Sequence, residues 1–72
     1  MKVRAITSIV NGVGYVIAYN YGNTAIKNVT FKWQSNLASP VEVFGESRML
    51  TPSLDTFTDN FAPYEAHVYV VR

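Results

Sequence analysis

Few side chains in this 72-residue sequence could catalyse a reaction or bind a metal ion, and their spacing does not favour such a site. His67 is the only histidine and cysteine is absent, so a metal site would lack its usual nitrogen and sulfur ligands. Asp55 and Asp59 lie in a turn-rich stretch, where carboxylates more often hold turns than bind calcium. A Ser53–His67–Asp59 triad can be written down, but no nucleophile-elbow motif accompanies it. The sequence therefore predicts no catalytic, cofactor-binding or metal-binding residue.

Three glutamates could supply the carboxylate pair of a glycosidase: Glu42, Glu46 and Glu65. That chemistry needs two carboxyl groups about 5 to 10 Å apart in a shielded cleft. The surrounding sequence places all three on outward faces or turns, which predicts solvated carboxylates. Glu46 and Arg48 are expected to form a local ion pair of small net worth.

Aromatic side chains are the other group with a chemical use, because an exposed ring can stack on a sugar or pack against a neighbouring domain. Aromatic residues make up 14% of the chain, more than so small a core needs. The surplus consists of Tyr15, Tyr19, Tyr21, Trp33 and Tyr69. The sequence favours packing against a neighbouring domain over sugar stacking.

Composition and charge narrow the class of protein. With 49% hydrophobic and 15% charged residues, the chain is expected to fold as one globular domain over residues 1–72. Its net charge is +1 and its six cations are scattered singly, whereas nucleic-acid binders cluster theirs. No apolar run approaches the roughly 20 residues of a membrane helix, and no signal-peptide core follows Met1. We therefore expect neither a nucleic-acid nor a membrane partner.

The positions of these residues depend on strands. Hydrophobic alternation with frequent turn residues predicts an all-β fold, a small antiparallel immunoglobulin-like β-sandwich of six to seven short strands, and no helix. The first five strands are expected at residues 2–10, 13–20, 25–33, 41–44 and 48–51. Asn11-Gly12 predicts a tight hairpin between the first two. Strand 13–20 is apolar on both sides, so that it is either covered on both faces or has an aromatic outer face. Phe57 is expected either on a very short strand or capping the core from a loop.

The stretch from 58 to 71 is expected to be a turn that launches a long final strand. Pro63 suits the first position of that strand, where no ladder donor is needed. The small apolar set of Tyr64, Ala66, Val68 and Val70 is predicted to face the core. The opposite set, which includes His67 and Tyr69, is predicted to face outward. Tyr64 is expected to form a tyrosine corner or to lie at the edge of the core.

With these residues laid out, the sequence resembles the small C-terminal β-sandwich domain that follows the catalytic (β/α)8 barrel in many glycoside hydrolases acting on plant polysaccharides. The resemblance runs through residues 15–20, 29–31, 41–48 and 57–69. Its specific parts are the segment Gly45-Glu46-Ser47-Arg48 and the block 57–69, in that order.

The resemblance implies a non-catalytic module whose partner is the catalytic domain of a parent glycoside hydrolase and, as an alternative, a polysaccharide. In such enzymes the catalytic carboxylates belong to the barrel, which implies that this chain is not an enzyme by itself and needs no cofactor. By the same likeness, His67 and Tyr69 are candidates for an interdomain surface. The location is extracellular if the parent is a secreted enzyme, and residues 1–72 are then an excised domain.

Two functions follow from these considerations. An accessory domain that packs on a catalytic barrel predicts an apolar patch along one sheet face. A carbohydrate-binding module predicts a flat platform of two or three coplanar exposed rings from the aromatic surplus. The arrangement of the exposed side chains distinguishes them.

Overall fold

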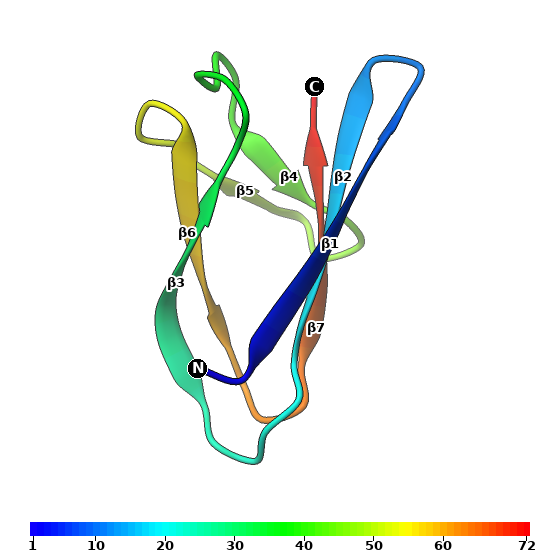
Figure 1. Cartoon of the computed structure of the whole chain (residues 1–72). Helices are drawn as coiled ribbons and strands as arrows, with labels where there is room; N and C mark the ends of the chain where they lie inside the picture. The colour runs from blue at the N-terminus through cyan, green and yellow to red at the C-terminus, as the bar shows by residue number, and fades with distance from the viewer.

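The computed structural model describes all 72 residues and consists of seven strands joined by short turns (Figure 1). This confirms the predicted all-β antiparallel sandwich, and no element is a helix that could cross a bilayer. The strands are β1 (Val3–Val10), β2 (Val13–Asn20), β3 (Ile26–Lys32), β4 (Val41–Val43), β5 (Arg48–Leu50), β6 (Thr56–Phe61) and β7 (Ala66–Val71).

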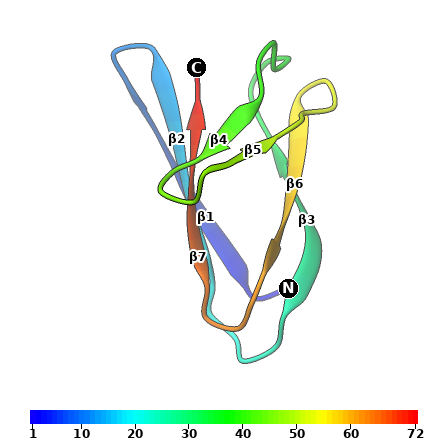
Figure 2. The same ribbon diagram turned by 180° about the vertical axis from the view of Figure 1, so that it is seen from behind.

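The strands form two antiparallel sheets of unequal size. The larger sheet has the order β1-β2-β7-β4-β5, and the smaller consists of β3 and β6 alone. In Figures 1 and 2 the β3–β6 pair faces the β2 and β7 part of the larger sheet. The smaller sheet therefore covers only part of the larger one.

The β1–β2 hairpin forms as predicted. Asn11 and Gly12 have φ values of 51° and 79°, the left-handed geometry that a two-residue hairpin turn requires. Pairing then runs without a shift from Val10↔Val13 to Val3↔Asn20. This register decides which residues of the two strands share a face.

The start of the last strand differs from the prediction. Residues 58–61 belong to β6, which also contains Phe57, and the turn comes later, at residues 62–65. Pro63 therefore lies in a turn and not at the first position of a strand. Tyr64 follows it with a φ of 59° and is 68% exposed, so the prediction that it faces the core or lies at its edge is wrong. The Glu65 amide donates to the Ala62 carbonyl at 3.1 Å, which closes the turn.

The face assigned to β7 was also wrong. His67 and Tyr69 are 3% and 0% exposed and point into the sandwich, whereas Ala66 is exposed and Val68 is half-buried on the other side. The sequence predicts that the small-residue face lies in the core, but the facing β3–β6 pair leaves room for a ring at position 69. The polar atoms of both buried side chains are hydrogen-bonded, which removes the penalty for burying them.

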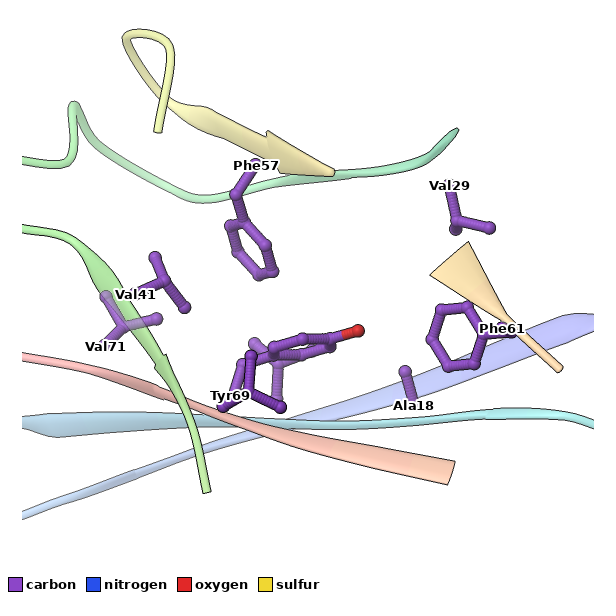
Figure 3. Packing of buried hydrophobic residues seen from close by; sticks show 9 residues of the cluster. Ala18, Val29, Val41, Phe57, Phe61, Tyr69 and Val71 are labelled. Atoms are coloured by element: carbon purple, nitrogen blue, oxygen red, sulfur yellow. The ribbon is translucent and has the colours of Figure 1, made fainter. Parts of the chain in front are cut away.

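Tyr69 lies at the centre of the core (Figure 3). Its ring centroid is 5.3 Å from that of Phe31 and 5.1 Å from that of Phe57, one ring from each strand of the smaller sheet. Phe31 also stacks on Phe57 at 5.2 Å. Such aromatic pairs add about 0.5–1.5 kcal/mol beyond the area that they bury. This cluster joins the two sheets.

Strand β1 is left outside the core. Only Val3 of its eight residues is half-buried, and the other seven are exposed. None of the fully buried core residues comes from β1. The reason is the two-strand width of the smaller sheet, which ends before it reaches β1.

Candidate functional site

The side of the larger sheet that faces away from β3 and β6 forms one surface, which we call the outer face. The register of β1, β2, β7, β4 and β5 assigns its residues. They are Arg4, Ile6, Ser8, Val10, Val13, Tyr15, Ile17, Tyr19, Glu42, Met49, Ala66, Val68 and Val70. Apart from Arg4, Ser8 and Glu42 they are all apolar or aromatic.

Much of this apolar surface is open to solvent. Ile6 and Ile17 are cross-strand partners, and their exposed fractions are 65% and 45%. Val10 extends the exposed area toward the β1–β2 turn, and Met49 is exposed separately on β5. Glu42 at its margin is paired with Arg72 at 2.6 Å. A contiguous patch of this kind usually marks a surface that another molecule covers.

The exposed aromatic rings do not form a flat platform. Tyr19 and Tyr21 are the nearest pair, with centroids 6.3 Å apart and planes inclined at 61°. The Arg4 guanidinium lies over the Tyr21 ring at 5.2 Å and occupies one of its faces. Tyr15 is half-buried on the outer face. The rings that the sequence grouped together are therefore not coplanar.

Trp33 lies on the opposite side of the sheet from Tyr15 and Tyr19. It packs against the core next to Gly14, where an added Cβ would come within 2.5 Å of two Trp33 ring atoms. Gly14 is on the inner side of β2, so that Trp33 cannot share a surface with the outer-face tyrosines. Tyr69 is buried in the core. The predicted aromatic candidates therefore do not lie on one surface.

A buried charged cluster connects β5, β6 and β7. The Arg48 guanidinium donates two hydrogen bonds to Asp59, at 3.0 and 2.9 Å, and the Tyr69 hydroxyl donates a third at 2.9 Å. Asp59 is 7% exposed and lies in a strand, not in the turn that was expected. The predicted Glu46–Arg48 pair is present, with Arg48 Nη2 2.9 Å from Glu46 Oε1. It belongs to a larger cluster of Glu46, Arg48, Asp59, His67 and Tyr69, which we call the clamp.

Hydrogen bonds decide the charge state within this clamp. Burial alone would raise the pKa of Asp59, but the bonds from Arg48, the Asn60 amide and Tyr69 lower it. The bond to Asp59, opposed by burial, raises the pKa of Arg48, while burial and Asp59 both raise the pKa of Tyr69. Asp59 and Arg48 are therefore both charged and Tyr69 is neutral at ordinary pH.

His67 completes the cluster. Its Nδ1 lies 2.5 Å from Glu46 Oε2, and its Nε2 lies 3.1 Å from the Asn60 carbonyl and 3.2 Å from Glu65 Oε1. Burial lowers the pKa of His67, but the bond to Glu46 and the Asn60 carbonyl outweigh it and raise the pKa above its ordinary value. Since both ring nitrogens face acceptors, these contacts favour the protonated ring.

The charged side chains of the clamp are engaged with one another. No buried side-chain nitrogen or oxygen lacks a hydrogen-bond partner. No Asp, Glu or His lines any of the three surface grooves, and no cluster of such residues is arranged to hold a metal ion. The carboxylates are engaged with Arg48 and His67, so that none is aimed at a space that a substrate could enter.

Sequence reasoning missed two polar residues that organise the fold. Asn20 is 1% exposed and donates to the carbonyls of Thr24 and Ala62, at 2.8 and 3.1 Å, which joins the two connections between the sheets. Asp59 was assigned to a turn although it alternates with Phe57 and Phe61, both of which are buried. That alternation was the available signal, because it places Asp59 on the inward side of its strand.

No family model, no curated protein and no solved structure matches the chain.

Proposed function

We propose that this chain is a non-catalytic accessory module that packs, through its outer face, on the catalytic domain of a carbohydrate-active enzyme. The observation that carries the proposal is the exposed apolar surface around Ile6 and Ile17. The class of partner comes from the resemblance of residues 41–48 and 57–69 to the sandwich domains of glycoside hydrolases.

The amount of apolar surface fits such a role. Fully burying an isoleucine side chain contributes about 1.5–3 kcal/mol, so the exposed parts of Ile6 and Ile17 alone would contribute about 2 kcal/mol to an interface. Interfaces between domains of one chain bury about 600–1,500 Å² and are commonly part polar. Arg4, Ser8 and Glu42 supply a polar margin of this kind.

The clamp supports the same role. It uses charged residues of the resemblance's two specific segments, Glu46 and Arg48 from one and Asp59 and His67 from the other, to hold β5, β6 and β7 together. Their part is then to hold the two sheets together, and the reactive carboxylates belong to the partner.

Carbohydrate binding through an aromatic platform is the weaker candidate. It requires coplanar exposed rings, whereas Tyr19 and Tyr21 are inclined at 61° and Trp33 lies on the other side of the sheet. An NMR titration with xylan, cellulose, mannan and arabinan oligosaccharides tests it. Shifts on several aromatic residues with one sugar class would restore this function.

The main experiment adds the purified chain to a (β/α)8 glycoside hydrolase domain from the same source, expressed without a sandwich of its own. We expect the melting temperature of the barrel to rise, and Ile17→Asp to abolish the rise. Thr30→Asp, on the exposed side of β3, is the matched control and should leave it intact. A barrel whose melting temperature is unchanged by the native chain would refute the proposal.

A further inference from the structure

The outer edge of β1 is a long unpaired strand edge at one end of the larger sheet. β1 pairs through all eight of its residues with β2 and with no other strand. The backbone groups on its other side therefore have no partner in the sheet. An edge of this length is a ready template for another extended chain.

The edges of β5 and β3 carry protection that β1 lacks. β5, at the opposite end of the same sheet, is three residues long. β3 contains an irregularity between Ile26 and Val29, with Asn28 at a φ of 57°. β1 has no proline, bulge or inward-pointing charge, because its one charged residue, Arg4, is on the outer face. Such devices normally prevent strand addition.

The space beside β1 suits the side chains of an added strand. Thr7 and Ile9 on its inner side line an open groove of about 590 Å³ together with Lys32, Trp33 and Gln34. Inward side chains of an added strand would enter this groove, and outward ones would lie next to Ile6 and Val10. Both faces of the new strand would thus have apolar neighbours.

The charges near the edge of β1 indicate which kind of strand would bind there. Lys2 and Arg4, near the start of β1, form no salt bridge. Lys32, beside the groove, has only a long ionic contact, because its Nζ lies 3.9 Å from Asp55 Oδ2. A second copy of β1 would bring only further cations, because residues 1–10 contain no Asp or Glu. An acidic segment would compensate these charges.

We propose that the edge of β1 binds an extended acidic segment of a partner protein as an additional antiparallel strand. Backbone hydrogen bonds to β1 supply affinity, and carboxylates next to Lys2 and Arg4 supply selectivity. This inference goes beyond packing of the outer face, because it uses the backbone edge and the groove on the inner side.

The test uses a synthetic peptide, Thr-Val-Thr-Val-Thr-Val-Glu-Val-Glu, and a twin with lysine in place of both glutamates. Binding to the isotope-labelled chain is followed by NMR. We expect the acidic peptide to shift the amides of β1 and the Trp33 indole, and to bind about tenfold more tightly than its twin. Arg4→Glu should narrow or reverse this preference. Lys27→Glu, the same charge change on β3, should leave it unchanged.

Two further measurements separate strand addition from other binding. N-methylation of one alternate set of peptide amides should abolish binding, while N-methylation of the other set should leave it intact. Ile17→Asp should leave peptide binding intact even where it prevents packing on a barrel. Equal binding of both twins, insensitivity to N-methylation, or a β1-paired dimer of the chain in sedimentation would overturn the proposal.

Discussion

At the scale of single residues, the clamp shows why buried charges in this fold depend on one another. Arg48 and Asp59 are each stabilised by the other, and breaking such a pair leaves a charge without compensation in a poorly solvated place. Arg48 is partly exposed, which reduces the penalty because water reaches its guanidinium. Asp59 has no such access.

We expect Asp59→Asn to lower the free energy of unfolding by about 2 kcal/mol, less than the roughly 3–5 kcal/mol of a fully buried pair, because Arg48 is partly exposed and keeps Glu46 as a partner. Urea denaturation followed by fluorescence measures this. Asp55→Asn is the matched control, since Asp55 lies 3.9 Å from an exposed lysine and should change stability by less than about 0.5 kcal/mol. Equal effects of the two variants would contradict the clamp.

His67 and the carboxylates make stability depend on pH in opposite directions. The raised pKa of His67 gives a contribution that is complete below its ordinary value of 6.5 and is lost as the pH rises through the folded value. The lowered pKa values of Glu46 and Asp59 give contributions that are complete above 4.5 and 3.8 and are lost as the pH falls. Stability should therefore be greatest between about pH 5 and 6.5.

Denaturation across pH 3–9 measures this profile, and His67→Gln should flatten its alkaline side while keeping the acid side. If the decline at alkaline pH persisted in that variant, another group would be responsible for it.

At the scale of elements, most strands follow from local pattern. The two-residue alternation and Asn11-Gly12 predict the β1–β2 hairpin, because its turn and its register are both local. The outer face of β2 proved aromatic, one of the two alternatives left open. The inward positions of Val29 and Phe31 likewise follow from alternation on β3.

The orientation of β7 could not be predicted in the same way. Alternation separates its residues into two sets, but the side on which the β3–β6 pair packs decides which set is buried. The apolar set of Val68 was the natural choice, since His67 is ordinarily a surface residue. The partners that make His67 and Tyr69 tolerable inside, Glu46 and Asp59, come from distant strands. The sequence of β7 alone therefore does not indicate that these partners are present.

The turn between β6 and β7 gives a prediction at this scale. Tyr64 adopts a φ of 59° although it has a Cβ and its side chain is 68% exposed. Because this conformation costs a non-glycine residue about 1 kcal/mol or more, Tyr64→Gly should raise the free energy of unfolding by about 1 kcal/mol. Tyr64→Ala keeps the Cβ and should give no such gain. A loss of stability in the glycine variant would mean that the tyrosine ring is needed in the isolated fold.

At the scale of the whole molecule, the unequal sheets divide the apolar residues into two groups with different roles. Residues between the sheets, such as Val41, hold the fold together. Residues on the outer face, such as Ile6 and Ile17, remain exposed after folding and are available to a partner. The same chemical change should therefore have opposite consequences in the two groups.

Replacing both Ile6 and Ile17 by threonine preserves strand propensity and should lower the free energy of unfolding by only about 1 kcal/mol, because both side chains are already largely solvated. Fluorescence of a hydrophobic dye bound to the native chain should fall in this variant. Val41→Thr, at a position with 0% exposure, should cost more than the two outer substitutions together and should increase dye binding. If the outer substitutions instead unfolded the chain, these residues would be part of its own core, and the outer face would not be free to pack on a partner.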